Sequence, residues 1–241
     1  MKPGRFSKLE ARAPNVTRGV TRWLLRESMG VVFVAATLFL FAGRLDWVMG
    51  WALVGLYVIW VGANALLLIP RNPELLAERA VRRRGDYAWD TVILGLFGLS
   101  MLAKFVVAGL DERFGWTPPL PPLLQGVALV VAFLGYALTT WAMVANTFFS
   151  TVVRIQQERR HRVTTGGPYR YVRHPGYVGA MVFELATPVV LGSLWALIPG
   201  GLAVPLLIIR TALEDRVLQE KLNGYREYAA QVRYRLIPGG W

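Results

Sequence analysis

The sequence predicts an all-α fold: a polytopic integral membrane bundle of about six transmembrane helices, ending in a short helix hairpin and a cytoplasmic tail helix. Hydrophobic residues make up 54% of the 241 residues and charged residues only 17%, whereas a soluble domain carries about 25% charged residues. The charges lie between long apolar runs, as in helical membrane proteins. These runs are too numerous to be a single signal peptide, so we expect them to remain in the protein.

Six apolar segments account for the predicted helices, since a helix needs about 20 residues to span a bilayer. They cover approximately residues 29–42, 47–69, 89–110, 123–149, 177–191 and 194–209. The second, third and fourth are long enough, whereas the first needs part of the amphipathic stretch before it. The last two are short and contain Pro188, Pro199 and Pro205, which favours a kinked or tilted hairpin packed against its neighbours. Helical spacing of apolar residues over 214–228 predicts the tail helix.

Lysine and arginine set the expected orientation, because cytoplasmic loops carry an excess of them. They gather in the N-terminal arm, in the second loop (Arg71, Arg79, Arg82, Arg83 and Arg84), in the fourth loop and in the tail. Six spans place all four basic regions on one side, whereas five spans would divide them. We therefore expect an inner cell membrane protein with both termini in the cytoplasm.

Charge and composition also exclude several kinds of site. The net charge of +12 is compatible with nucleic-acid binding, but its placement in alternate loops favours topology and contact with anionic membrane lipids, so we expect no nucleic-acid partner. The absence of cysteine excludes disulfides, thiolate metal sites and cysteine nucleophiles. The only histidines are His161 and His174, which argues against a metal centre. We expect His161 to be solvated in its arginine-rich loop.

Residues 166–177 form the most distinctive polar stretch, between two hydrophobic regions. Within it, Pro175 biases His174 away from the helical conformation and is suited to begin the next helix. The free amides of a helix start, with Arg173 beside them, favour a carboxylate or another polar ligand group. The alternative is a basic membrane boundary with ordinary interfacial aromatics such as Tyr177.

Acidic residues at the end of the sixth apolar segment form a second candidate site. Glu214 and Asp215 are costly at a membrane edge unless they are solvated or paired. Arg210 lies one turn before Glu214, so the two form either a helical ion pair or part of a ligand site. The hairpin returns these residues to the side on which His174 lies, so the two candidate sites should face each other.

Three further polar residues lie in or near the apolar segments. Glu184 is either functional or a hydrogen-bonded interior carboxyl. Lys104 is expected to extend to the interface or to pair with Asp111. Asn146, near the end of the fourth segment, is either a helix cap or a substrate contact.

The combined pattern over roughly residues 146–241 resembles the isoprenylcysteine carboxyl methyltransferase family, and the phospholipid N-methyltransferases share its overall plan. The pattern is Gly167-Pro168-Tyr169-x-x-x-Arg173-His174-Pro175-x-Tyr177, a hydrophobic hairpin, Arg210 with Glu214-Asp215, and Tyr225-x-x-Tyr228. The sequence departs from the family in two places. The second of two usually adjacent glutamates is Asp215 here, and the segment Lys221-Leu222-Asn223-Gly224 is one residue shorter than usual.

The resemblance implies an S-adenosylmethionine-dependent methyltransferase with its cofactor between the membrane end and the tail. It implies cofactor contacts from Val163, Gly167, Pro168, Tyr169, His174, Pro175, Tyr177 and Glu214. It implies catalytic roles near the substrate carboxylate for Arg173 and Arg210, and we expect substrate contacts from Asn146, Glu184 and Asp215. We divide the chain into a basic arm (1–27), helices one to four (28–149) and a methyltransferase core (150–241).

Several functions remain open at this point. The favoured one is methylation of a lipophilic acceptor, a small molecule or a prenylated substrate, on a carboxylate, thiol or amine, with the carboxylate preferred. Methylation of an amine would instead need a base such as Glu184 or His174. An NADPH-dependent membrane reductase shares the helical plan, and a transporter or scaffold would bind no cofactor. No internal repeat supports transport.

Overall fold

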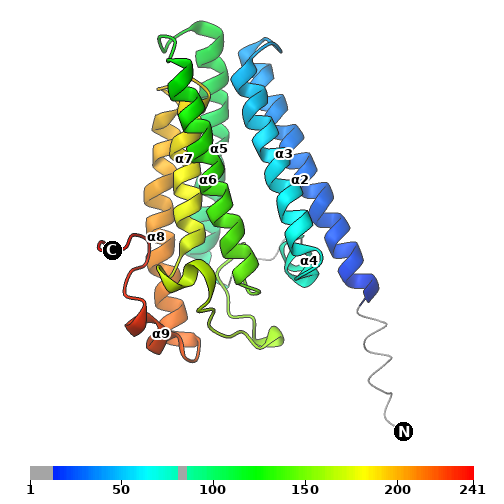
Figure 1. Ribbon diagram of the computed structural model, residues 1–241, viewed down its shortest axis with the longest axis vertical. Helices are drawn as coiled ribbons and strands as arrows, with labels where there is room; N and C mark the ends of the chain where they lie inside the picture. Colours follow the sequence, from blue (N-terminus) through cyan, green and yellow to red (C-terminus); the bar gives the residue numbers. More distant parts are fainter. Residues whose placement is uncertain (1–12, 81–85) are drawn as a thin grey trace.

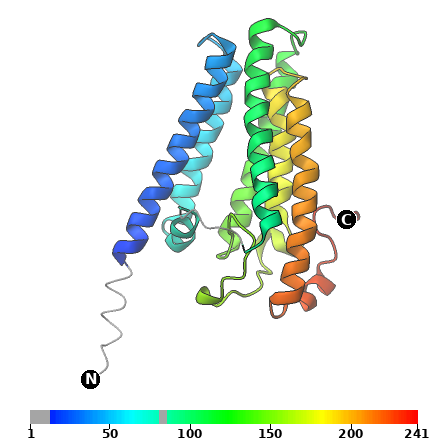
Figure 2. The ribbon, with the colours of Figure 1, turned by 180° about the vertical axis from the view of Figure 1, so that it is seen from behind.

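A computed structural model describes residues 13–80 and 86–241, and the described residues contain helices and loops but no strands. In chain order the elements are α2 (Ala13–Ala42), α3 (Val48–Leu68), α4 (Pro73–Ala80), α5 (Ala88–Phe114), α6 (Pro122–Ala145), η1 (Gln157–Arg159), η2 (Gly167–Arg170), α7 (Pro175–Val190), α8 (Leu197–Lys221) and α9 (Tyr225–Gln231). The long helices run side by side, while the short α4 and α9 lie at one end of the bundle (Figures 1 and 2). The predicted all-α membrane bundle is confirmed.

The outer surface of the bundle is apolar, as a lipid-facing surface must be. Within the described residues, the five helices α2, α3, α5, α6 and α8 are long and apolar enough to cross a membrane. Large apolar side chains on their outer faces are exposed, among them Leu40, Leu66 and Leu123, which are 72–79% exposed. Exposed apolar area on this scale needs lipid to cover it. The protein is therefore an integral membrane protein.

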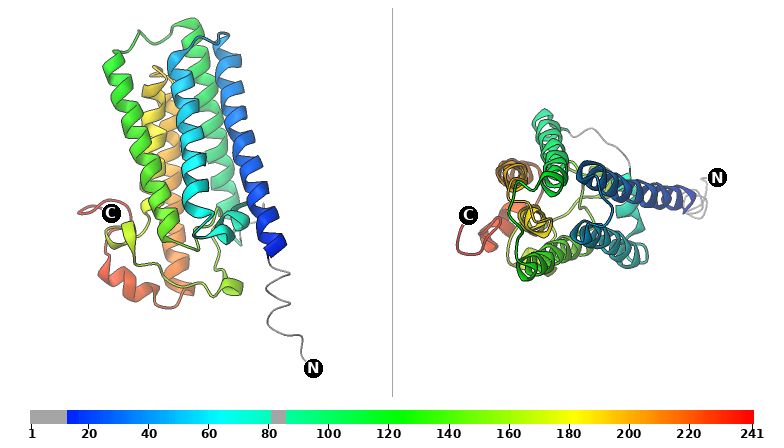
Figure 3. Two further views of the ribbon diagram at one scale, coloured as in Figure 1. Left: turned by 45° about the vertical axis from the view of Figure 1, so that its right-hand side comes forward. Right: turned by 90° about the horizontal axis from the view of Figure 1, so that it is seen from above.

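The sixth predicted segment, α7, is only 16 residues long. Seen along the bundle, it lies among the other long helices (Figure 3), and its residues Phe183, Ala186 and Val190 are buried in the same core cluster as residues of α2, α3, α5 and α6. A helix surrounded by protein need not match the bilayer thickness. The predicted short hairpin is thus α7 followed by α8, with Pro188 inside α7 and Pro205 inside α8.

Two element ends differ from their predicted positions. Helix α2 begins at Ala13, so residues 13–27 of the predicted basic arm continue the first span as helix. The predicted tail helix over 214–228 is divided: α8 ends at Lys221, and α9 begins after Gly224. Gly224, the residue before α9, has a φ of +80°, a conformation that glycine adopts readily and that lets the chain turn between the two helices.

Close packing of α6 against α7 fixes the position of the helix that follows His174. A Cβ atom built on Gly179 would lie 2.4 Å from the carbonyl oxygen of Gly135 and 2.4 Å from the Thr139 hydroxyl. Small residues at such contacts let two membrane helices approach closely. The glycines therefore hold α7 near α6, which supports one side of the region around His174.

We expect Gly179→Ala to destabilise the protein by about 1–3 kcal/mol, because the added methyl group must push against backbone. Gly126→Ala on α6 is the matched control, since nothing lies within 4 Å of a Cβ atom at that position, and it should be neutral or slightly stabilising. Thermal unfolding in detergent measures both. Equal melting temperatures for the two variants would show that the close contact does not limit packing.

An ion pair inside the bundle joins α5 to α7. The Lys104 Nζ atom lies 2.6 Å from Glu184 Oε2, and the two side chains are 0% and 3% exposed. The expectation that Lys104 extends to the interface or pairs with Asp111 is therefore wrong, because Glu184 on the facing helix is within reach. Asp111 instead accepts hydrogen bonds from the Thr117 backbone and from the Ser193 hydroxyl.

The loops and short helices gather at one end of the bundle. Helices α4 and α9, the loop between α6 and α7, and the N-terminal end of α2 all lie at this end (Figures 1 and 3). It is the end that the basic residues predict to be cytoplasmic. Of those basic residues, Lys2, Arg5, Lys8, Arg12, Arg82, Arg83 and Arg84 lie outside the described residues.

Candidate active site

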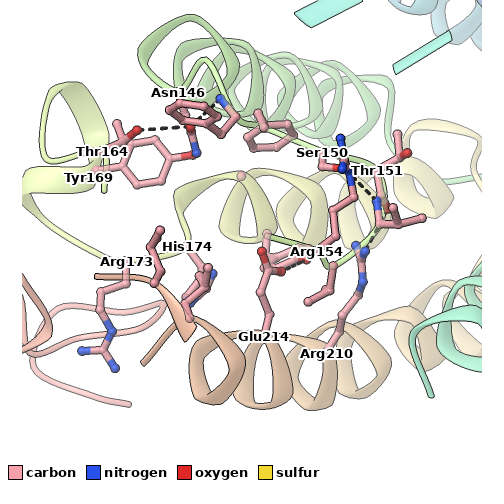
Figure 4. Close-up of a pocket in the computed structure, with 18 of the residues that line it drawn as sticks. Asn146, Ser150, Thr151, Arg154, Thr164, Tyr169, Arg173, His174, Arg210 and Glu214 are labelled. Atoms are coloured by element: carbon pink, nitrogen blue, oxygen red, sulfur yellow. Dashed lines mark hydrogen bonds between the residues drawn. The ribbon is translucent and has the colours of Figure 1, made fainter. Parts of the chain in front are cut away.

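A cavity of about 350 Å³ opens at this end of the bundle. Its walls come from α4, the first turns of α5, the end of α6, the loop after α6, the start of α7, the middle of α8, and α9. It brings together eight of the predicted site residues: Asn146, Val163, Tyr169, Arg173, His174, Tyr177, Arg210 and Glu214 (Figure 4). Five other predicted residues lie outside its lining: Gly167, Pro168, Pro175, Glu184 and Asp215.

His174 precedes α7, and Pro175 is the first residue of that helix, as predicted. The backbone N–H of Arg173 donates to the Tyr234 carbonyl and that of His174 to the Arg235 carbonyl, both at 2.9 Å. The C-terminal tail therefore runs beside this turn and satisfies its amides. A ligand at the pocket must be held by side chains or by other amides, because these two are already bonded.

Asp215 is the centre of a buried network under the pocket. Its carboxylate accepts hydrogen bonds from Arg173 Nε at 2.7 Å, Arg235 Nε at 2.9 Å and the Tyr225 hydroxyl at 3.0 Å. His174 Nε2 lies 3.3 Å from the same carboxylate. Asp215 is 0% exposed. This geometry favours a positioning role for Asp215 over the predicted substrate contact.

Arg173 is engaged by the protein itself. Besides Asp215, its Nη1 atom donates to the carbonyls of Val232 and Arg233 at 2.8 Å. In Figure 4 its guanidinium points away from Asn146 and Tyr169 on the opposite wall. Arg173 therefore joins the tail to the turn before α7, and its cationic end is not directed at the pocket.

Glu214 and Arg210 do not form the helical pair that their spacing allows. The Glu214 carboxylate instead accepts a hydrogen bond from the Tyr177 hydroxyl. Arg210 Nε lies 2.7 Å from Asp90 Oδ1, and its Nη2 donates to the Thr151 carbonyl at 2.9 Å. The Arg210 guanidinium also lies 5.4 Å from the centre of the Tyr177 ring. Among the described residues, Glu214 thus has no cationic partner, whereas Arg210 is paired with the carboxylate of Asp90.

Tyrosines form the wall nearest the tail. The Tyr228 hydroxyl donates to the Tyr169 carbonyl at 2.7 Å, and the Tyr225 and Tyr228 rings meet edge to face. The Asn146 amide donates to the Tyr169 hydroxyl at 3.3 Å, and its carbonyl accepts from Thr164 at 3.1 Å. Burial raises the pKa of Tyr169, so its hydroxyl stays protonated. Asn146 both ends α6 and orders this wall.

His161 lies in the pocket wall rather than in solvent, contrary to expectation. Its ring stacks on Phe148 with centroids 4.5 Å apart, and its Nδ1 atom accepts the Gln156 backbone N–H at 3.3 Å. Burial, with smaller contributions from Arg154 and Arg159, lowers the pKa of His161 from 6.5 to about 4. The imidazole is therefore neutral at physiological pH.

We expect the protein to lose stability as the pH falls from 6.5 towards 4. In this window the unfolded chain binds a proton on His161 that the folded chain does not, so unfolding becomes more favourable. Melting temperatures measured across this range should fall less steeply for His161→Asn, whose amide carbonyl can accept the same hydrogen bond. Parallel curves for the variant and the wild type would exclude His161 as the source.

Sequence reasoning missed the contributions of α4 and α5. Asp90, which holds Arg210, is 0% exposed; its only signal in the sequence was an acidic residue in the first turn of an apolar helix. Leu94 and Phe97 of α5 and Arg79 of α4 also line the cavity. Arg79 was interpreted only as a topological charge. Their roles depend on how the N-terminal helices pack, which local patterns do not reveal.

Comparisons with known proteins identify the family to which the chain belongs. The sequence model of the Isoprenylcysteine carboxyl methyltransferase (ICMT) family matches residues 127–220. The chain is 39% identical over 183 residues to a probable protein-S-isoprenylcysteine O-methyltransferase of Oryza sativa subsp. indica, covering 72% of this chain and 92% of that protein. It is 41% identical over 70 residues to the protein-S-isoprenylcysteine O-methyltransferase of Schizosaccharomyces pombe, covering 29% of this chain and 30% of that protein. A solved structure of the eukaryotic intramembrane Ras methyltransferase ICMT is similar with a TM-score of 0.47 and 16% identity, covering 90% of this chain and 92% of that one. The protein thus belongs to the isoprenylcysteine carboxyl methyltransferase family and is an integral membrane methyltransferase.

Proposed function

We propose that the protein transfers a methyl group from S-adenosylmethionine to the carboxylate of a lipophilic acceptor of the prenylcysteine type. The observation that carries this proposal is the composition of one cavity. It joins a polar wall of Glu214, His174 and tyrosines to apolar residues of membrane helices, such as Leu94 and Leu207. A polar donor and a lipid-like acceptor can therefore meet there. The O-methyltransferase names of the relatives support the choice of a carboxylate.

The residues present fit S-adenosylmethionine, which carries an ammonium group, ribose hydroxyls, an adenine ring and a sulfonium. Glu214 is half-buried in the pocket and has no arginine or lysine partner in the part of the chain that the structure describes. It is suited to hold the ammonium or the hydroxyls. Tyr169, Tyr225 and Tyr228 provide aromatic surface for the adenine. The cofactor, when bound, supplies a methyl group on a sulfur that leaves readily.

The reaction requires the protein mainly to align the methyl donor with the acceptor. A carboxylate acceptor is already anionic at neutral pH, so its oxygen forms the bond to the methyl carbon while the carbon–sulfur bond breaks, and no proton moves. The positive sulfonium and the negative carboxylate become a neutral thioether and a neutral ester. Holding the two in line supplies most of the rate enhancement. Arg210, fixed by Asp90 beside Tyr177, supports the anionic partner.

The geometry gives the other candidate activities less support. An amine acceptor must lose a proton, but Glu184 is paired with Lys104 outside the pocket lining. His174 Nε2 is directed at Asp215 and Tyr225. No relative reported above is a reductase.

The proposal extends to the orientation of the protein and to the roles of its two halves. The pocket lies at the end where the basic loops gather, so we place that end, and both termini, in the cytoplasm. We place the protein itself in the inner cell membrane. We assign most of the donor wall to residues 150–241, the part of the chain in which the sequence division places the methyltransferase core. Helices α4 and α5 extend the site into the N-terminal half.

Cofactor binding should depend on the Glu214 charge. We expect Glu214→Gln to weaken binding of S-adenosylmethionine by roughly 10- to 100-fold, the effect of losing one charged hydrogen bond. Glu220→Gln is the matched control, because Glu220 is exposed on the same helix and outside this cavity. Isothermal titration in detergent measures both. Binding of NADPH in place of S-adenosylmethionine, or equal affinities in the two variants, would contradict the assignment.

The product identifies the acceptor group. With methyl-labelled cofactor and an S-farnesyl cysteine derivative, we expect label that mild alkali releases as methanol, because only an ester is cleaved in this way. The acceptor with its carboxylate already esterified should gain no label. Alkali-stable label, or transfer to phosphatidylethanolamine, would instead indicate amine methylation.

A further inference from the structure

Five arginines line the cavity, and they differ in what holds them. Arg173 and Arg210 are paired with carboxylates as described above, and Arg154 pairs with Glu78 at 2.6 Å. Arg162 is exposed. Arg79 differs from all four. Its guanidinium has no carboxylate within pairing distance among the described residues, and its Nε atom is buried without a hydrogen-bond partner.

The packing of α4 holds Arg79 in place. Helix α4 lies so close to α2 that a Cβ atom on Gly19 would be 2.4 Å from the Ala77 Cβ atom. Leu75 and Leu76 of α4 are fully buried with Trp23 of α2 in one cluster. The Phe149 ring packs against the Arg79 guanidinium, with 5.5 Å between the guanidinium carbon and the ring centre. The side chain is therefore positioned by the fold, although no anion holds it.

Arg79 is half-buried, and a cation whose Nε atom is buried without a partner is energetically unfavourable; two cationic neighbours add to this cost. Burial lowers the pKa of Arg79 to about 10; Glu27 opposes this shift, while Arg26 and Arg210 add to it. Arg79 is still protonated at neutral pH. It therefore places a poorly compensated positive charge near Arg210, where an anion would be stabilised.

Arg79 lines the polar cavity and interacts electrostatically with Glu27, a residue that lines an apolar cavity. A second cavity, of about 270 Å³, is lined by Gly98, Met101, Leu102 and Phe105 of α5 and includes Glu27. Leu94 and Phe97, which line the first cavity, lie one turn before these residues on the same face of α5. An acceptor with its apolar tail along this face would present its polar end at the junction.

We propose that Arg79 binds the carboxylate of the methyl acceptor at the junction of the two cavities, on the side of the pocket away from Glu214. This inference rests on the proposed function and adds to it a residue from the N-terminal half of the chain. The donor also carries a carboxylate. Arg79 is assigned to the acceptor because α4 packs against α2, whose Glu27 lines the apolar cavity, whereas Glu214, His174 and Tyr225 form the wall assigned to the donor.

Arg79→Met tests the proposal through acceptor kinetics. We expect the KM for the prenylcysteine acceptor to rise by roughly 10- to 100-fold, since a charged hydrogen bond to the carboxylate is lost, while the Kd for S-adenosylmethionine stays unchanged. Arg79→Lys keeps the charge but not the planar guanidinium, so its acceptor KM should lie between those of the wild type and Arg79→Met. Arg71→Met is the control, because Arg71 is exposed beside α4 and outside this cavity.

Two further measurements separate binding from folding. The primary amide of the acceptor lacks the charge, so it should inhibit the wild type far more weakly than the carboxylate does, and Arg79→Met should lose this discrimination. The variant should also melt at the same or a higher temperature without ligands, because it removes a half-buried charge that has no counter-ion. A structural role for Arg79 predicts the opposite shift.

The possible failures are distinguishable. If the wild type forms an ester and Arg79→Met has an unchanged acceptor KM, the assignment of Arg79 is overturned and the proposed function stands. A raised donor Kd with an unchanged acceptor KM would assign Arg79 to the donor carboxylate and also overturn it. If the wild type forms no ester from the acceptor, both proposals fall.

Discussion

Glu184→Leu is expected to lower the free energy of unfolding by about 3–5 kcal/mol, because it leaves the Lys104 ammonium buried without its partner. Lys104 is 0% exposed, and its Nζ atom lies 4.9 Å from the centre of the Phe105 ring and 5.5 Å from that of the Phe183 ring. Neither ring replaces a carboxylate. Thermal or denaturant unfolding in detergent should show the loss at once.

The double variant Lys104→Met/Glu184→Leu tests whether the loss of stability comes from the unpaired Lys104. Replacing a buried ion pair by apolar side chains of similar volume is often neutral or stabilising, so the double variant should recover most of the stability. It should also bind S-adenosylmethionine normally, since neither residue lines the pocket. A double variant as unstable as Glu184→Leu would mean that Glu184 stabilises the bundle through something other than Lys104.

Asp215→Asn is expected to cost a similar amount, about 3–5 kcal/mol, because the change leaves the guanidinium of Arg173 buried without its counter-ion. It should also release the C-terminal tail, since Arg235 on the tail and Tyr225 of α9 bond to the same carboxylate. Trypsin should then cleave after Arg233 and Arg235 in the variant sooner than in the wild type. Binding of S-adenosylmethionine should weaken as the tyrosine wall loosens.

Asp46→Asn provides the comparison for Asp215→Asn. Asp46 also pairs with an arginine, Arg44, at 2.7 Å, but its side chain is 74% exposed, and solvent screens such pairs. It should leave melting temperature, proteolysis and cofactor binding unchanged. Equal effects of the two substitutions would show that the charge alone matters and that the buried position of Asp215 does not.

Local patterns in the sequence were enough to predict the helices and one half of the site. Apolar length and basic loops predicted the bundle and its hairpin, because both depend on composition along the chain. The motif containing Tyr169, His174 and Tyr177 lies on the pocket, as does Glu214 after the hairpin. Spacing within the motif, together with the return of the chain through the α7–α8 hairpin, was sufficient to predict that these residues lie near one another.

The partners of the charged side chains could not be predicted in the same way. Arg210 pairs with Asp90, 120 positions away, and Lys104 with Glu184, 80 positions away. Which face of each helix turns toward which neighbour decides such pairs, and apolar helices with little amphipathic pattern do not reveal it. For the same reason the sequence did not predict the position of Arg79. Its charge was consistent with a topological role, and only the packing of α4 shows that it lines the cavity.

The bonds between the tail and the turn before α7 also set the order in which the enzyme becomes competent during synthesis. Ribosomes make the chain from its N-terminus, so all the membrane helices exist before residues 232–235, whose carbonyls bind Arg173 and His174. A nascent chain therefore carries an inserted bundle whose donor pocket lacks its closing wall. On the proposed function, we expect chains that stop before Tyr225 to insert as membrane proteins that bind the methyl donor weakly.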